Sequence, residues 1–175
     1  MKIDVNISHI YASPEHHYFT REKFDIGSAP TYELEYVDLK PNRGIKGDRF
    51  EFSKYPLTLI SEEVMQAVCQ ELELPYKPRL FRRNIVISGI NLNQLIGRRF
   101  FMDGIEFEGL EHCAPCTWMN AVMKKGAYGL MSGRGGLRIR ANTAGRLTKG
   151  AKVLVTEGEI ELLSPLAALK KPKIP

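Results

Sequence analysis

Apolar and polar residues alternate over many short segments of the chain, a pattern typical of half-buried β-strands. Ile3, Val5 and Ile7 show this alternation near the start. The same alternation, or a short apolar run, predicts further strands over residues 32–36, 56–60, 84–88, 98–102, 105–111, 137–141, 151–155 and 159–163. Asp103-Gly104 separates two of them and is a dipeptide favoured in two-residue hairpin turns. The pattern therefore predicts a succession of short strands, including one tight hairpin.

Fewer segments of the chain show a pattern typical of helices than of strands. Ser61 can cap a helix that runs to Leu72, because an acidic first turn and an apolar stripe follow it. Shorter helical segments are predicted over residues 91–96 and 117–124, whereas the polar stretch 12–30 reads as a long excursion from the body. Few helices and no repeated strand-helix-strand pattern indicate a mainly β fold, a β-barrel with a few short helices.

Composition fits one compact domain. The chain has 175 residues, of which 43% are hydrophobic and 26% charged, within the range of globular proteins. We expect one domain over residues 1–166, followed by a flexible basic tail over 167–175 that is rich in Lys and Pro. The net charge of +5 does not by itself imply nucleic-acid binding.

The cellular location is predicted from the absence of targeting signals and from the number of cysteines. The first residues alternate instead of forming the apolar centre of a signal peptide, and no apolar run is long enough to span a bilayer. Three cysteines cannot form a complete set of intramolecular disulfides. We therefore expect a cytoplasmic protein with no membrane partner.

Reactive chemistry is concentrated at Cys113-Ala114-Pro115-Cys116, between the hairpin and the helix predicted from Thr117. A thiolate is favoured at a helix N-terminus, which is where Cys116 would lie. Three uses remain open: a zinc site completed by histidines, a dithiol redox centre, and a single thiolate that ligates a soft metal or carries a persulfide. Cys69 lies beside the apolar stripe of a helix and reads as a core residue.

Basic and glycine-rich segments accompany this pair in the second half of the chain. Arg82-Arg83-Asn84 precedes a strand, and Gly133-Arg134-Gly135-Gly136-Leu137-Arg138 offers unobstructed backbone N–H groups beside two cations. Guanidinium groups pair with phosphate in a planar, bidentate way. Together the two segments predict a pocket for a phosphorylated ligand.

Several motifs resemble, in order, those of the MOSC domain, the C-terminal domain of molybdenum-cofactor sulfurases. They are Gly44-Ile45-Lys46-Gly47-Asp48-Arg49, Phe81-Arg82-Arg83-Asn84-Ile85-Val86, the segment 91–98, the cysteine pair, and Arg134-Gly135-Gly136-Leu137-Arg138. The resemblance covers about residues 30–160. It implies a β-barrel-rich fold that binds molybdenum cofactor, a phosphorylated pterin dithiolene, or carries sulfur for it.

Site residues follow from the resemblance by motif position. Cys116 matches the cysteine that ligates molybdenum in members that act as enzymes. The resemblance assigns cofactor binding to Arg49, Arg82, Asn84, Arg134, Gly135 and Arg138. Phe50 stands where many small members have His, and His16 or His17 could replace that residue. No pyridoxal phosphate site is expected within this chain.

Two functions compete within this resemblance. One is a molybdenum-dependent oxidoreductase that reduces N-hydroxylated compounds with electrons from a separate donor protein. The other is a non-redox carrier of a persulfide or of the cofactor. Nucleic-acid binding would need exposed aromatics among the arginines. Only Phe100 and Phe101 qualify, and at least one of them must face the core of a strand, so no nucleic-acid partner is expected.

Overall fold

The computed structural model describes residues 1–16, 22 and 27–170. The strands are β1 (Lys2–Ala12), β2 (Tyr32–Leu34), β3 (Tyr36–Leu39), β4 (Leu57–Ser61), β5 (Ile85–Ser88), β6 (Arg99–Met102), β7 (Ile105–His112), β8 (Leu137–Ala141), β9 (Gly145–Thr148) and β10 (Gly150–Thr156). The helices are α2 (Glu62–Glu71), α3 (Met119–Val122) and α4 (Ala127–Met131), with short 3-10 helices η1 (Pro78–Phe81) and η2 (Leu92–Leu95). The prediction of a mainly β fold with a few short helices is confirmed.

A closed barrel forms the body of the protein. Seven strands pair in the order β1, β10, β6, β7, β8, β4 and β5, and β5 returns to β1. The register of β1 on β10, from Lys2 opposite Val155 to Ile7 opposite Gly150, closes the ring. All neighbours are antiparallel except β4 and β5, which are parallel and joined by α2. The Asp103-Gly104 hairpin is confirmed, and both of its turn residues have positive φ.

Two apolar clusters stabilise this arrangement. Leu59 and Ile85 point into the barrel, whereas the adjacent Ile60 and Val86 pack under the helices. These strands are therefore apolar on both faces, which explains why β4 and β5 read as continuous apolar runs and not as alternating ones. Phe100 is fully buried in the barrel, so it is a core-facing member of the Phe100-Phe101 pair, of which at least one was predicted to face the core.

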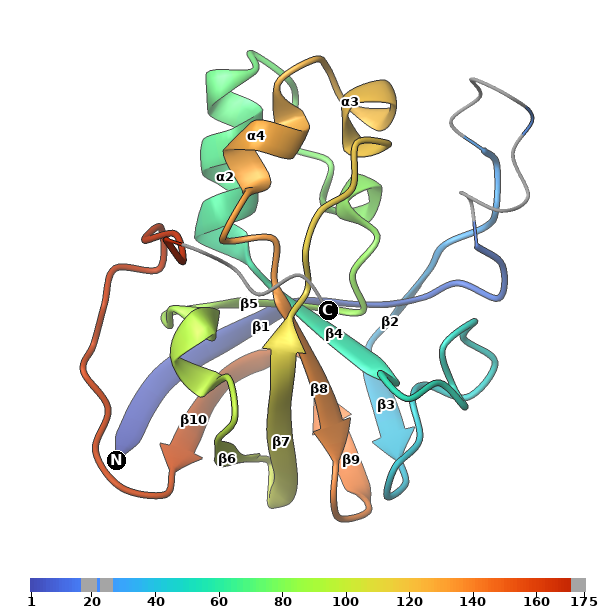
Figure 1. Cartoon of the computed structure of the whole chain (residues 1–175). Helices are drawn as coiled ribbons and strands as arrows, with labels where there is room; N and C mark the ends of the chain where they lie inside the picture. Colours follow the sequence, from blue (N-terminus) through green and yellow to red (C-terminus); the bar gives the residue numbers. More distant parts are fainter. Residues whose placement is uncertain (17–21, 23–26, 171–175) are drawn as a thin grey trace.

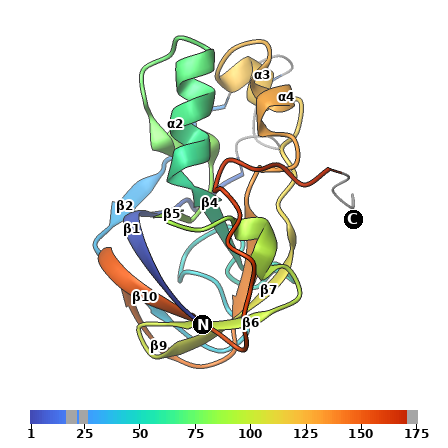
Figure 2. The ribbon, with the colours of Figure 1, turned by 90° about the vertical axis from the view of Figure 1, so that its left-hand side faces the viewer.

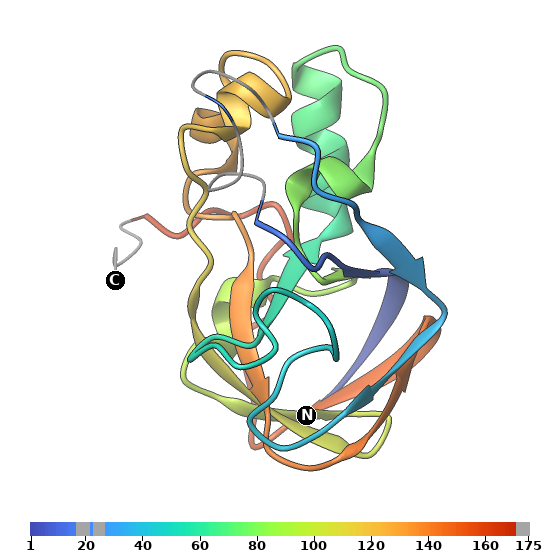
Figure 3. The same cartoon turned by 90° about the vertical axis from the view of Figure 1, so that its right-hand side faces the viewer.

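The helices gather at one end of the barrel, above β4 and β5 (Figure 1). Ser61 caps α2 as predicted, because its hydroxyl accepts a hydrogen bond from the Val64 N–H at 3.2 Å. Figure 3 shows the connection from β7 to α3 (yellow) rising from the barrel to these helices. In the same view the β3–β4 connection (teal) lies in front of the barrel.

Three predicted elements differ from the structure. Residues 159–163 form no strand, because both edges of β10 are already paired with β1 and β6. The strand predicted over residues 32–36 is interrupted at Glu35, and its halves pair with different partners. The helix predicted from Thr117 begins at Met119 and is one turn long.

Among the described residues, none of the helices has the length and apolar character needed to cross a bilayer. Residues 171–175 of the predicted basic tail lie outside the described residues, as do His17 and most of the stretch between Tyr18 and Asp25. The backbone N–H of Leu169 donates a hydrogen bond to the Gly133 carbonyl at 2.8 Å. The first part of the tail is thus attached to the body, and its flexibility stays a prediction for the residues beyond.

The Ser61 cap gives a direct test of how α2 is held over the barrel. Ser61→Ala removes the acceptor of the Val64 N–H, so we expect the free energy of unfolding to fall by about 1 kcal/mol. Urea denaturation followed by far-UV circular dichroism measures the change. Ser61→Thr, which keeps the hydroxyl, is the control. An alanine variant as stable as the threonine variant would show that the cap contributes nothing.

Candidate functional site

The cysteine pair lies on the connection between β7 and α3. The Cys113 N–H donates a hydrogen bond to the Gly136 carbonyl at 2.8 Å, which extends the β7–β8 ladder by one residue. Cys113 is buried, whereas Cys116 is exposed. α3 is a single turn that starts at Met119, and the Cys116 carbonyl accepts a hydrogen bond from the Met119 N–H at 3.0 Å. Cys116 thus lies at the turn that leads into α3, two residues before its N-cap Trp118.

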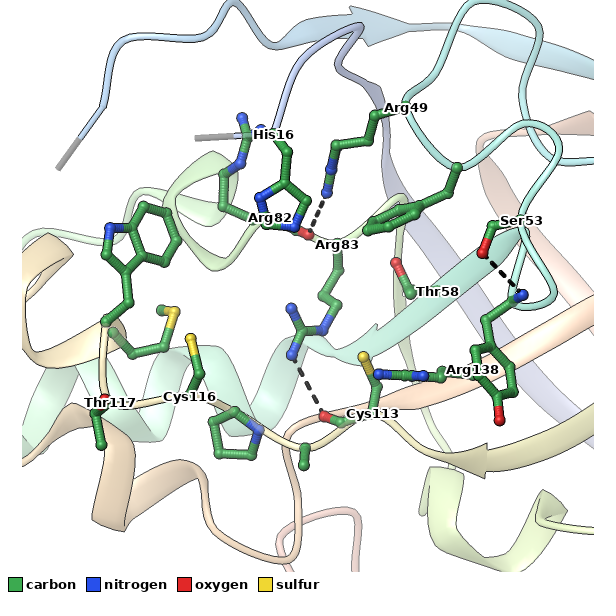
Figure 4. Close-up of a pocket in the computed structure, with 16 residues that line it drawn as sticks. His16, Arg49, Ser53, Thr58, Arg82, Arg83, Cys113, Cys116, Thr117 and Arg138 are labelled. Carbon is green, nitrogen blue, oxygen red and sulfur yellow. Dashed lines mark hydrogen bonds between the residues drawn. The ribbon is translucent and has the colours of Figure 1, made fainter. Parts of the chain in front are cut away.

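Both cysteines line a cavity of about 360 Å³. In Figure 4 their side chains point toward the side that carries Arg49, Arg82 and Arg83. The described residues around this cavity are His16, Arg49, Phe50, Ser53, Tyr55, Thr58, Arg82, Arg83, residues 113–119 and Arg138. Four arginines and no carboxylate are among them. The cavity therefore presents an excess of positive charge beside two thiols.

Arg83 joins the two loops that form the cavity wall. Its Nε donates to the Gly135 carbonyl at 3.1 Å, and its Nη2 donates to the Cys113 carbonyl at 3.3 Å, the second bond being drawn in Figure 4. A third bond runs from Nη1 to the Phe81 carbonyl at 3.2 Å. The Arg83 side chain thus fixes the cysteine connection to the glycine-rich loop.

Arg82 lines the cavity but mainly anchors the excursion that follows β1. Its Nη2 donates to the Ser13 hydroxyl at 2.9 Å and to the Glu15 carbonyl at 3.1 Å, and its Nη1 bonds to the Thr31 hydroxyl. Burial, with the charge of Arg49 beside it, lowers the pKa of Arg82 to about 10. These partners are neutral, so the Arg82 charge is compensated only weakly by its contacts.

Arg49 is the second partly buried cation of the cavity. Burial and the neighbouring Arg83 lower its pKa, and the Asp48 carboxylate, 3.5 Å from its Nη1, opposes that shift. Its guanidinium stacks on the Phe50 ring at 4.5 Å. Asp48 also accepts a hydrogen bond from the Ser13 N–H at 2.8 Å. The same carboxylate therefore contacts both the Arg49 guanidinium and the backbone at the start of the segment that follows β1.

Arg138 closes the opposite side of the cavity. Its Nη1 lies 2.9 Å from Oε1 of Glu111, and its guanidinium stacks on the Tyr55 ring at 4.4 Å. The Glu111 carboxylate does not line the cavity. Arg138 can therefore present its positive charge to a ligand from a fixed position.

The remaining residues predicted to bind cofactor lie outside the cavity lining. Asn84 is buried, where its Oδ1 accepts from the Thr58 N–H and hydroxyl and its Nδ2 donates to the Tyr11 carbonyl. Arg134 donates to the Leu130 carbonyl at 2.7 Å. Gly135 packs behind the cysteine connection. The structure thus brings Cys116, Arg49, Arg82 and Arg138 together and leaves Asn84, Arg134 and Gly135 outside.

Histidines near the site have different settings. His16 lines the cavity, with its ring edge-to-face to Phe50 at 5.8 Å. His112 is buried behind the cysteine connection, where its Nε2 accepts from the Gly135 N–H at 3.2 Å and its Nδ1 has no partner among the described residues. Burial, with the charges of Arg83 and Arg138, lowers the pKa of His112. His112 is therefore held neutral.

Arg83 belongs to the basic segment that the sequence predicted at the pocket, but the family resemblance gave it no role, and His112 was considered only as a possible zinc ligand. The signal for Arg83 was the run of three polar residues before a buried strand. Arg82 has a left-handed backbone with φ of 57°, and this turn sends the side chains of Arg82 and Arg83 to different partners.

No group of three or more His, Cys, Asp and Glu side chains that could hold a metal is found in the part of the chain that the structure describes. A metal at this site would thus depend on a thiolate together with ligands from outside the chain.

Comparison with known proteins places this architecture in a family. The sequence profile of the MOSC domain matches residues 15–159. The chain therefore belongs to the MOSC domain family. A search of curated protein sequences finds no match.

Solved structures share the fold at low sequence identity. YuaD from Bacillus subtilis aligns with a TM-score of 0.71 at 15% identity, covering 91% of this chain and 99% of YuaD. YiiM from Geobacillus stearothermophilus aligns with a TM-score of 0.66 at 13% identity, covering 93% of this chain and 80% of YiiM. YiiM from Escherichia coli aligns with a TM-score of 0.62 at 17% identity, covering 96% and 75%. At these identities the similarity establishes the fold alone.

The different burial of the cysteines predicts selective labelling. In native protein an alkylating reagent should modify Cys116 rapidly and Cys113 and Cys69 slowly, because only Cys116 is exposed. Intact mass and peptide mapping count the modified sites, and denatured protein should label at all three. Cys116→Ser should abolish the fast phase. Rapid native labelling of Cys113 would contradict the arrangement of this connection.

Neutral His112 predicts a pH dependence of stability. Because the folded pKa lies below that of the unfolded chain, about 6.5, the unfolded state takes up the proton first as pH falls. The His112 contribution is thus complete above pH 6.5 and is lost as pH drops toward the folded pKa.

His112→Gln keeps an acceptor for the Gly135 N–H but cannot titrate. Urea midpoints measured between pH 8 and pH 5 should therefore fall more steeply for the wild-type protein than for His112→Gln. Parallel profiles would show that His112 is not held neutral.

Proposed function

We propose that this MOSC-family protein binds molybdenum cofactor in the arginine-lined cavity, with Cys116 as the protein ligand of the metal. The observation that carries this proposal is an exposed thiol in a cavity that four arginines and no carboxylate line. Thiolates suit soft transition metals, and guanidinium groups suit phosphate. The donor set therefore fits both ends of a phosphorylated pterin dithiolene that carries molybdenum.

Each residue would contribute in its own way. Cys116 would bind the metal at the open side of the cavity. Arg49 and Arg138 would attract the anionic part of the cofactor, since each is fixed by stacking on an aromatic ring. Arg83 would hold the cysteine connection at a constant position. The buried walls would limit access of water around these charges, which strengthens their electrostatic effect.

The reaction we propose is reduction of an N-hydroxylated compound. The bound cofactor would supply the two-electron chemistry, and electrons would come from a separate donor protein. His16 and Tyr55 are the titratable side chains of the lining that, with the thiols, could exchange a proton with a substrate. We place the protein in the cytoplasm, where its three free cysteines remain reduced.

A carrier function is the second candidate. The exposure of Cys116 favours it, because a sulfur donor protein can reach that thiol. Cys116 would then hold a persulfide, or the cofactor itself, for delivery. Both candidate functions use the Cys116 thiol. In the enzyme a reduced product would leave the cavity, whereas in the carrier the sulfur or the cofactor would leave it.

Metal content separates the candidates. Protein purified gently from a host that makes the cofactor should contain molybdenum, and Cys116→Ser should contain at least about tenfold less. Cys69→Ser, which changes a thiol buried under the helices, is the matched control. Elemental analysis measures the metal, and mass spectrometry detects a sulfur adduct on Cys116.

Each result has one meaning. Molybdenum that is lost in Cys116→Ser supports the cofactor site, and turnover of an N-hydroxylated compound with a reductant supports the enzyme. A persulfide without molybdenum supports the sulfur carrier. Protein that holds neither, although Cys116 is accessible, would overturn both candidates.

A further inference from the structure

The segment over residues 163–169, the C-terminal strap, runs from η2, where the Leu163 N–H donates to the Gln94 Oε1 at 3.1 Å, toward the helical end of the barrel. Figure 2 shows it (red) running beside η2 toward the level of the helices. The Asn91 Nδ2 donates to the carbonyls of Ser164 and Ala167 at 2.7 and 3.0 Å. The Leu169 N–H donates to the Gly133 carbonyl at 2.8 Å. The strap is thus bound at its middle by η2 and at its end by the glycine-rich loop.

Gly133 and Arg134 form the receiving surface of the strap. A Cβ on Gly133 would lie 2.5 Å from the Leu169 carbonyl oxygen, so only glycine permits this close approach. Arg134 donates from Nε to the Leu130 carbonyl at 2.7 Å and from Nη1 to the Leu166 carbonyl at 3.2 Å. The arginine therefore links the end of α4 to the strap.

The other end of the same loop contacts the cysteine connection. A Cβ on Gly135 would lie 2.7 Å from the Cys113 carbonyl oxygen and from the Pro115 Cδ. The Gly135 N–H donates to His112, and its carbonyl accepts from Arg83, which also holds the Cys113 carbonyl. A change in the position of this loop must therefore displace the backbone on which Cys116 is presented.

We propose that the C-terminal strap positions the Cys113–Cys116 connection through Gly133, Arg134 and Gly135, and so sets the exposure and reactivity of the Cys116 thiol. Arg134 is then a positioning residue and not a ligand of the cofactor. The path is a contiguous series of hydrogen bonds and close backbone contacts. A consequence for cofactor retention rests on the proposed function, whereas the effect on the thiol does not.

Asn91→Asp releases the strap with the least change elsewhere. An aspartate keeps the side-chain oxygen that accepts from the Asn93 N–H, but it lacks the two donors and places a charge against the Ser164 and Ala167 carbonyls. Asn142→Asp is the matched control, because it makes the same chemical change at the opposite end of β8 and breaks a bond to Glu106.

The experiment compares metal-free proteins by hydrogen exchange and by the rate of Cys116 alkylation. In Asn91→Asp we expect the Leu169, Gly135 and Cys113 amides to exchange at least about tenfold faster, and the alkylation rate to change at least about threefold. The control should leave the three amides and the thiol as in wild type. Arg134→Gln should reproduce the effect, and Arg134→Lys should restore part of it.

The proposal is overturned if the Leu169 amide loses protection while the Gly135 and Cys113 amides and the Cys116 alkylation rate stay within about twofold of wild type. If Leu169 stays protected in Asn91→Asp, a chain that ends at residue 162 removes the strap outright, and the same comparison decides between the outcomes for Gly135, Cys113 and Cys116. Because no metal is present, failure here leaves the proposed function standing, and failure of the molybdenum test leaves this inference standing.

Discussion

The candidate site depends on one side chain, the guanidinium of Arg83. It donates to carbonyls on three separate connections, at Phe81, Cys113 and Gly135. No carboxylate pairs with it among the described residues, so its partly buried charge is stabilised by carbonyl dipoles and by whatever enters the cavity. The ends of β5, β7 and β8 meet at the helical end of the barrel. The hydrogen bonds of Arg83 fix the connections next to these ends, and so fix the shape of the cavity.

Charge balance explains what such a cavity can hold. Asp48 and Glu111 pair with Arg49 and Arg138, but neither carboxylate lines the cavity. The interior is left with guanidinium groups of which two have depressed pKa values because they are partly desolvated. An anionic ligand would relieve that cost. The charge balance of the cavity is therefore suited to an anionic ligand.

The sequence predicted local features well because short-range rules govern them. The hairpin at Asp103-Gly104 and the Ser61 cap depend on neighbouring residues only, and both were confirmed. The failed strand at residues 159–163 depended on barrel closure, which no local pattern shows. Arg83 and Arg134 illustrate the same limit at the site, because the direction of a long side chain is decided by the loops that meet around it. The order of the motifs predicted which segments form the cavity. The separate contacts of its arginines could be assigned only from the structure.

The proposed function rests on Cys116 as a ligand of molybdenum within this cavity. X-ray absorption at the molybdenum edge measures the sulfur neighbours of the metal directly, in wild type and in Cys116→Ser reconstituted with excess cofactor. We expect one sulfur neighbour fewer in the serine variant, with the sulfur neighbours of Cys113→Ser unchanged. An unchanged sulfur shell in Cys116→Ser, or a loss that occurs only in Cys113→Ser, would contradict it.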